Sequence, residues 1–230
     1  KTSSKSRSCC RPFESVREID MKNTKCGFVA LIGEPNAGKS TLMNRIVGAK
    51  VSIVTHKVQT TRARIRGIAM QENSQLVFVD TPGLFKTRRK LDKAMVAAAW
   101  SGAADADIVV LIVEAHRGIT SGVEMILEGL EKRDVKDQRL ILAINKIDKI
   151  KSDALLSLTQ SLNQRLNFEE TFMISAEKGY GVKVLQDWLS ENLPVGPYLY
   201  PEDQIADVPM RMIAAEMTRE KLMLRLHQEL

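Results

Sequence analysis

The sequence has few cysteines and no long apolar run, and each absence excludes a class of protein. Its three cysteines, Cys9, Cys10 and Cys26, are odd in number and lack the spacing of metal ligands. They therefore support neither a disulfide framework nor a zinc site, and a reducing cytosol is the simplest setting. Apolar runs such as residues 108–113 are far shorter than the roughly 18 residues that suggest a membrane-spanning helix.

Histidine is scarce as well, and its distribution does not suggest catalysis. The three histidines, His56, His116 and His227, are far apart, and their spacing suggests no carboxylate or serine partner. A catalytic triad or a histidine metal site needs such partners, so we expect surface or packing roles for these side chains.

Basic charge is concentrated at the N-terminus. The formal net charge is +6, and residues 1–25 carry seven basic and three acidic side chains, so the remainder is nearly balanced. We expect this segment to be a flexible, solvated extension rather than a binding patch. No apolar stretch follows its basic start, which argues against a secretory signal. It is either the remnant of an organelle transit peptide, which implies the mitochondrial matrix, or an extension ahead of a native start at Met21.

Apolar strands and amphipathic helices alternate along the chain. Strands are predicted at 28–32, 63–70, 75–80, 108–113, 140–144 and 171–174, and helices at 41–47, 93–103, 121–132, 153–166 and 182–192. This order predicts an α/β domain over residues 26–195, in which a six-stranded, mostly parallel sheet has helices on both faces. A ligand is expected at the carboxyl ends of the strands. Residues 196–230 are predicted to be a linker and a connector helix.

Residues 33–40 read Gly-Glu-Pro-Asn-Ala-Gly-Lys-Ser and lie between the first strand and the first helix. Gly33 and Gly38 allow backbone N–H groups to turn inward around a polyphosphate, and the helix N-terminus adds a favourable dipole. Lys39 can reach the β- and γ-phosphates, while Ser40 can offer its hydroxyl to a Mg²⁺ ion that bridges them. The segment therefore predicts a phosphate-binding loop.

Asp80-Thr81-Pro82-Gly83 follows the third predicted strand. An aspartate at this place can hold Mg²⁺ through water, and the Gly83 amide can face the γ-phosphate. Taken alone, these residue types are typical of an ordinary turn. Behind a phosphate-binding loop, the nucleotide-binding interpretation is favoured.

Asn145-Lys146-Ile147-Asp148 follows the fifth strand and indicates which base is bound. The Asp148 carboxylate can accept hydrogen bonds from guanine N1–H and the N2 amine, a donor pair that adenine does not present. Adenine would leave that carboxylate unpaired, so GTP is favoured over ATP. Asn145 and Lys146 can brace the base and the phosphate loop, and Ser175-Ala176 can offer a backbone N–H to guanine O6.

Together these segments resemble the Era family of bacterial ribosome-assembly GTPases, within the translation-factor-like branch of P-loop GTPases. The resemblance covers residues 27–230 and includes the connector, from Pro201-Glu202-Asp203 to Arg219-Glu220-Lys221-Leu222. Five guanine-nucleotide motifs carry it: 33–40, 59–62, 80–83, 145–148 and 174–176. It implies that GTP and GDP are bound by Gly33, Glu34, Pro35, Asn36, Ala37, Gly38, Lys39, Ser40, Thr41, Asp80, Thr81, Pro82, Gly83, Asn145, Lys146, Asp148, Ser175 and Ala176.

The resemblance also implies a mechanism with two departures from Ras-like enzymes. Thr61, or alternatively Thr60, would join Ser40 and Asp80 at Mg²⁺ when the γ-phosphate is present. Leu84 stands where Ras-like enzymes carry the glutamine that orients water. Relatives use an asparagine at the place of Asn36 to hold K⁺, which could replace an arginine finger, although turn propensity also explains this residue. The implied catalytic residues are Asn36, Lys39, Thr61, Asp80 and Gly83.

The family continues into a KH domain that reads the 3′ end of small-subunit rRNA through a Gly-x-x-Gly loop. The last glycine of this chain is Gly196, so we expect that loop to be absent from residues 1–230. The implied location is the cytoplasm, with a peripheral contact to the inner membrane. Two other functions stay open: a nucleotide-dependent binding module with negligible turnover, and the G domain of a tRNA-modification GTPase, against which the connector argues.

Overall fold

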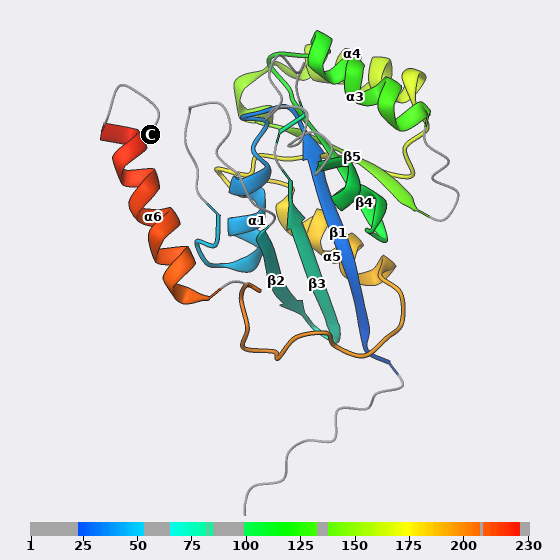
Figure 1. Cartoon of the computed structure of the whole chain (residues 1–230). Coiled ribbons are helices and arrows are strands. Elements are labelled where there is room, and N and C mark those ends of the chain that lie inside the picture. The colour runs from blue at the N-terminus through cyan, green and yellow to red at the C-terminus, as the bar shows by residue number, and fades with distance from the viewer. Residues whose placement is uncertain are drawn as a thin grey trace, which may run out of the picture.

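The computed structural model describes residues 23–52, 65–81, 83–84, 99–132, 138–207 and 209–225. Its sheet consists of six strands in the order β2-β3-β1-β4-β5-β6. Only β2 and β3 pair antiparallel, whereas every other neighbouring pair is parallel. The mostly parallel sheet predicted from the sequence is therefore confirmed (Figure 1). The strands are β1 Lys25–Gly33, β2 Ile65–Gln71, β3 Ser74–Asp80, β4 Ile108–Glu114, β5 Arg139–Asn145 and β6 Thr171–Met173.

The helices lie on both faces of the sheet, as predicted (Figure 1). Side chains alternate along β1, so that Val29 and Leu31 join one buried apolar cluster, with residues of α1 and α5. Ala30 and Ile32 join a second cluster, with residues of α3 and α4. All of β4 is buried, as expected for a central strand covered on both faces. The helices are α1 Lys39–Val47, α3 Ser121–Glu131, α4 Ser152–Arg165, α5 Val182–Asn192 and α6 Met210–Arg225, with a short 3-10 helix, η1, at Ile147–Lys149.

Two predicted segments are described only in part. The helix expected at 93–103 is helical from 99 to 104, and its first residues lie outside the described part of the chain. The loop expected at 52–62 is described at Ser52 alone, so Thr60 and Thr61 lie outside the description, as does Pro82. The turn between β2 and β3 lies between the strands predicted at 63–70 and 75–80, with Glu72 at a φ of 52°.

The linker after α5 packs against the edge of the sheet before it reaches α6. Gln75, on β3, accepts hydrogen bonds from the backbone N–H groups of Leu199 and Tyr200 at 2.9 and 3.0 Å. Ala206 forms an antiparallel bridge to Gly67 of β2. These contacts place the start of α6 beside the outermost strand (Figure 1).

The connector helix combines apolar and polar residues on its inward side. Its sequence pattern indicates one apolar face from Met210, Ile213, Ala214 and Met217, which shifts to a second face toward the C-terminus. Among the side chains that the structure describes in α6, Ile213 is buried, whereas Ala214 and Met217 are exposed. Glu220 is also buried and forms an ion pair with Lys50, so the described inward contacts include a charged residue as well as an apolar one.

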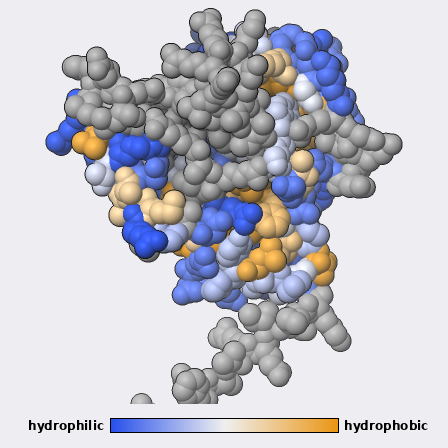
Figure 2. All heavy atoms as spheres, in the orientation of Figure 1, coloured by the Kyte–Doolittle hydropathy of each residue, from blue (hydrophilic) through white to orange (hydrophobic). Residues whose placement is uncertain are grey.

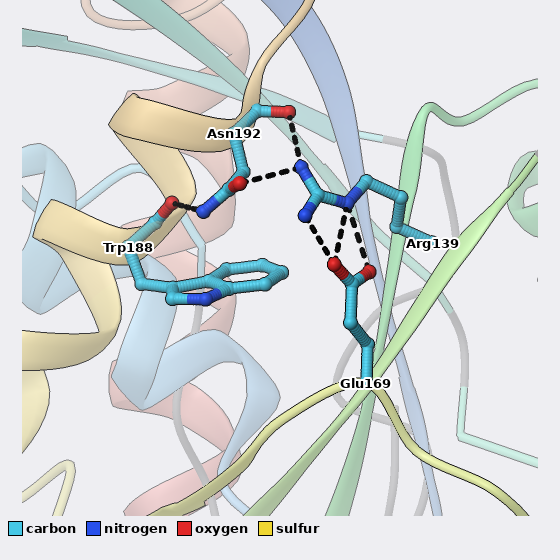
Figure 3. A network of polar contacts seen from close by, with 4 residues as sticks. All are labelled: Arg139, Glu169, Trp188 and Asn192. Atoms are coloured by element: carbon cyan, nitrogen blue, oxygen red, sulfur yellow. Dashed lines mark hydrogen bonds and ion pairs between the residues drawn. The ribbon is translucent and has the colours of Figure 1, made fainter.

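At the opposite end of the sheet from the candidate site, a polar cluster fastens α5 (Figure 3). Arg139, at the start of β5, donates hydrogen bonds to Asn192 O and Oδ1 at 3.0 and 2.6 Å and is paired with Glu169. Its guanidinium lies 4.9 Å from the ring centroid of Trp188, so the cation also stacks on an aromatic face. The Arg139 guanidinium holds the pKa of Glu169 below its ordinary value.

In the described part of the chain, no helix is long and apolar enough to cross a bilayer. On the face drawn in Figure 2, apolar residues lie in small groups among hydrophilic ones.

Candidate active site

Four of the predicted motif segments follow the carboxyl ends of β1, β3, β5 and β6, on one edge of the sheet. The phosphate loop leaves β1 at Gly33 and enters α1 at Lys39. Within it, the Ala37 N–H donates to Glu34 O at 3.3 Å, and Gly38 has a φ of 102°. A Cβ atom at Gly38 would lie 2.1 Å from Asn145 Nδ2, so only glycine fits between the loop and β5. Thr41, in the first turn of α1, is half-buried.

Lys39 is a buried cation whose ammonium group lies inside the loop. Nζ donates to Gly33 O and Glu34 O at 3.2 and 2.8 Å. Burial lowers the pKa of Lys39 from 10.5 to about 8, although Asp80 and Glu34 partly oppose this shift. An anion beside a buried ammonium group stabilises its charged form, so this arrangement is suited to phosphate binding.

The residues predicted to hold Mg²⁺ meet at the end of β3. Ser40 Oγ donates to Asp80 Oδ2 at 2.8 Å, and both side chains are buried. Thr81 is turned away, since its hydroxyl donates to Leu31 O at 2.6 Å. Hydroxyl and carboxylate oxygens are the ligands that Mg²⁺ prefers, so Ser40 and Asp80 fit this ion.

The segment after Asp80 runs back beside the phosphate loop. The Leu84 N–H donates to Gly33 O at 3.0 Å, which holds Gly83 next to that loop. The Leu84 side chain is fully buried in the apolar cluster with α3 and α4. Its burial there is consistent with the absence of a water-orienting side chain at this position.

Asn145 joins three segments of the site. Its Nδ2 donates to Ala37 O at 2.8 Å, while Oδ1 accepts from the N–H groups of Lys146 and Ala176 at 2.8 and 2.9 Å. Asn145 is almost fully buried, so these bonds are shielded from water. The Ala176 N–H, which we expected to face guanine O6, is thus directed at Asn145 Oδ1 in this structure.

Asp148 stands beside the loop after β6. The Ser175 hydroxyl, followed by Lys178, lowers the pKa of Asp148 below its ordinary value. Lys178 Nζ lies 3.4 Å from Asp148 Oδ2. A carboxylate that stays charged is the acceptor that guanine N1–H and the N2 amine require.

Asn36 lies at the exposed tip of the phosphate loop with a φ of 65°. Asparagine is enriched in this left-handed conformation, so the turn explanation accounts for its presence. A role with K⁺ therefore stays a prediction.

Sequence reasoning overlooked several polar residues that support the site. Ser52 Oγ donates to Asp80 Oδ2 at 2.7 Å, so Asp80 receives hydrogen bonds from two serines. Asn44 fixes this serine, because its Oδ1 accepts from Ser52 N at 2.9 Å and its Nδ2 donates to Ser52 O at 2.7 Å. The sequence signal was weak, since a polar residue on an amphipathic helix is ordinary.

Glu114 is a further overlooked residue, and it corrects our expectation for His116. Glu114 is buried at the end of β4, where Oε2 lies 3.0 Å from Lys146 Nζ. Its other oxygen lies 2.8 Å from His116 Nδ1, so this histidine has the carboxylate partner that its spacing did not suggest. His116 is exposed, so of the surface and packing roles that we expected for the histidines it has the surface one.

Comparison with known proteins decides the family. The model of the 50S ribosome-binding GTPase family matches residues 28–146. A curated relative, GTPase Era of Dinoroseobacter shibae, is 73% identical over 207 residues, which are 90% of this chain and 67% of that protein. The chain belongs to the Era family of GTPases. It spans about two thirds of the length of the Era proteins that it matches.

Solved structures of the Era family agree with this assignment. One is Era in complex with MgGDPNP and nucleotides 1506–1542 of 16S ribosomal RNA, with 37% identity and a TM-score of 0.83. It is matched over 90% of this chain and 70% of that chain. A variant of Aquifex aeolicus Era bound to GDP·AlF₄⁻ has 36% identity and a TM-score of 0.82, over 90% of this chain and 69% of that one.

The buried Lys39 leads to a prediction about stability in the Era fold. Below pH 8 the folded protein carries a buried ammonium, which costs about 3 kcal/mol relative to the unfolded chain. Between pH 8 and 10.5 the unfolded chain keeps a proton that the folded protein has released, so stability should rise with pH. Lys39→Met should raise the free energy of unfolding at neutral pH by about 1–3 kcal/mol and abolish that rise.

Urea titrations of nucleotide-free protein at neutral and alkaline pH would test this prediction. The control is Lys183→Met, since Lys183 is exposed and paired with Asp187 on α5, and it should change stability by less than about 1 kcal/mol. An unchanged pH dependence in Lys39→Met would show that burial of this ammonium is not costly.

Proposed function

We propose that the chain binds GTP and GDP with Mg²⁺, hydrolyses GTP slowly, and acts as a nucleotide-dependent switch in assembly of the small ribosomal subunit. The observation that carries this proposal is the arrangement around Asn145, which links the phosphate loop to the segment that contains Ala176. It supports the proposal because Lys39, which would bind phosphate, and Asp148, which would read the base, lie on the same edge of the sheet.

Six of the predicted site residues have defined roles in this proposal. Lys39 and the N-terminus of α1 would hold the phosphates, and Ser40, Asp80 and Thr61 would hold Mg²⁺. The bound metal neutralises charge on the phosphate oxygens. The Gly83 amide would donate to the γ-phosphate, while Asp148 would accept from the guanine edge. These assignments are supported by the contact of Ser40 with Asp80.

Competition binding tests the proposal directly. Labelled GDP bound to the chain should be displaced by unlabelled GTP and not by ATP, because adenine offers the Asp148 carboxylate no donor pair. Equal displacement by ATP would refute the base assignment. Phosphate release during incubation with GTP and Mg²⁺ then separates an enzyme from a binding module, since the latter would show binding without turnover.

The relatives support the ribosomal part of the proposal. A relative is solved with 16S ribosomal RNA, and curated relatives are named GTPase Era rather than tRNA-modification proteins. We therefore favour rRNA of the small subunit as the partner of the intact protein, in the bacterial cytoplasm. Peripheral contact with the inner membrane and a mitochondrial location both stay predictions.

Hydrolysis should be slow and sensitive to the monovalent cation. Without an arginine finger, turnover can be lower by about 10³ to 10⁵. If Asn36 holds K⁺ near the phosphates, replacing K⁺ by Na⁺ at constant ionic strength should lower turnover by about tenfold. Phosphate release measured in the two salts checks this.

Asn36→Gly is the informative variant, because glycine adopts the same positive φ without an amide. Loss of the K⁺ effect in this variant would support a ligand role for the amide. A K⁺ effect that survives would assign Asn36 to the turn alone, and equal rates in both salts for the unaltered chain would remove the potassium mechanism.

Residues 1–230 should bind rRNA only weakly. The Gly-x-x-Gly loop through which a KH domain clamps single-stranded RNA does not occur after Gly196 in this sequence. Contact through the basic residues 1–25 should fade between about 50 and 200 mM salt. Titration of a labelled rRNA 3′ oligonucleotide against a scrambled one tests this. Tight, sequence-selective binding at the higher salt would place RNA recognition within residues 1–230.

A further inference from the structure

Arg45, which the sequence analysis did not single out, connects α1 to the loop after β6. It lies on the last turn of α1 and donates through Nε to Ala176 O at 2.5 Å. A second nitrogen, Nη2, donates to Glu177 O. Because these acceptors are consecutive backbone carbonyls, one planar guanidinium holds the segment in a single orientation.

The segment that Arg45 holds contains the groups that face the base-reading carboxylate. The Ser175 hydroxyl lowers the pKa of Asp148, and Lys178 lies 3.4 Å from the same carboxylate. From the other side, the Ala176 N–H is fixed by Asn145 Oδ1 at 2.9 Å. The segment is thus held between β5 and α1, and Arg45 supplies the contact from α1.

The same helix carries both ends of the site. Lys39 is its first residue and lies against the phosphate loop, and Arg45 lies six residues later, against the segment beside Asp148. An α-helix is a rigid spacer, so it fixes the distance between a phosphate anchor and a base anchor. Nucleoside recognition depends on that distance, because both ends of one ligand must be engaged together.

We propose that Arg45 is a positioning residue for guanine recognition, holding the 175–178 segment against Asp148 while taking no part in phosphate binding. This inference rests on the proposed function, since it assumes that Asp148 reads guanine. A purely structural alternative exists, because a cation in the last turn of a helix stabilises the helix dipole. That alternative predicts an effect on stability and none on base recognition.

Two variants separate these roles. Arg45→Lys keeps the charge at the end of α1 but lacks the planar fork that reaches two carbonyls, whereas Arg45→Ala removes both. If Arg45 positions the segment, both variants should bind GDP about tenfold more weakly, while Arg45→Lys keeps the thermal stability of the unaltered chain. Arg45 is exposed, so we expect both variants to fold.

The matched control is Arg165→Ala. Arg165 also lies in the last turn of a helix, α4, where it is half exposed and paired with Glu124 at 3.4 Å. Its side chain pairs with α3 rather than with the segments described around the candidate site, so GDP affinity should stay within about twofold of the unaltered chain.

The measurement is the Kd for GDP and, by competition, for inorganic tripolyphosphate, which reports on the phosphate loop alone. Weaker GDP binding with unchanged tripolyphosphate binding in both Arg45 variants supports the inference. Unchanged GDP binding in Arg45→Lys overturns it and leaves the proposed function intact. A parallel loss for both ligands assigns Arg45 to the phosphate loop or to general stability, and also overturns it. If the unaltered chain binds tripolyphosphate but no guanine nucleotide, the proposed function fails and the inference falls with it.

Discussion

Asp148→Asn is expected to lower the affinity for GDP by about a hundredfold or more and to raise the affinity for xanthosine diphosphate. The Asp148 carboxylate presents two acceptors, whereas an asparagine amide presents one acceptor and one donor. Guanine offers two donors to this position, but xanthine replaces the N2 amine by a carbonyl, which can accept from the amide. The low pKa of Asp148 keeps the unaltered carboxylate charged at neutral pH, so the loss involves charge-assisted bonds.

Equilibrium binding of fluorescent GDP, with unlabelled GDP and xanthosine diphosphate as competitors, measures the change in nucleotide preference. Asp187→Asn on α5 is the control, because the partners of Asp187 are Gln71 and Lys183, neither of which belongs to a motif segment. It should leave the preference for GDP unchanged. If Asp148→Asn weakened GDP and xanthosine diphosphate equally, Asp148 would be a structural residue rather than the group that reads the base.

Asn145→Ala is expected to lower the free energy of unfolding by about 3 kcal/mol or more, because it leaves several buried polar groups unpaired. Ala37 O would lose its donor, and the N–H groups of Lys146 and Ala176 would lose their acceptor. Each unsatisfied buried group costs about 1–3 kcal/mol. GDP binding should be lost as well, since the variant separates the phosphate loop from the segment that contains Ala176.

Urea denaturation followed by circular dichroism measures the stability, with the slope on denaturant as a check on two-state behaviour. Asn163→Ala is the matched control. Asn163 also bonds to backbone and hydroxyl oxygens, but it is exposed on α4, so its loss should cost less than about 1 kcal/mol. If the two variants lost the same free energy of unfolding, the contacts of Asn145 with three segments would stabilise the fold no more than an exposed asparagine does.

The sequence by itself determined the order of the elements and the motif segments. Short apolar runs separated by amphipathic stretches can only bury their surface as a sheet covered by helices, and parallel strands place their carboxyl ends on one edge. The residues after Gly33, Asp80 and Asn145 were therefore certain to share that edge once the alternation was recognised. The phosphate loop was predicted from residue types alone, because glycines, a lysine and a serine at fixed spacing define such a loop.

Contacts between segments distant in the sequence were decided by the tertiary structure alone. Ser52 at Asp80, Glu114 at Lys146 and Glu220 at Lys50 are pairs that no periodicity marks, because each residue is ordinary within its own element. In the connector helix, Glu220 likewise takes a buried position that hydrophobicity alone assigns to an apolar residue. Periodicity reports the burial of one element, whereas a hydrogen bond or an ion pair depends on where two elements meet.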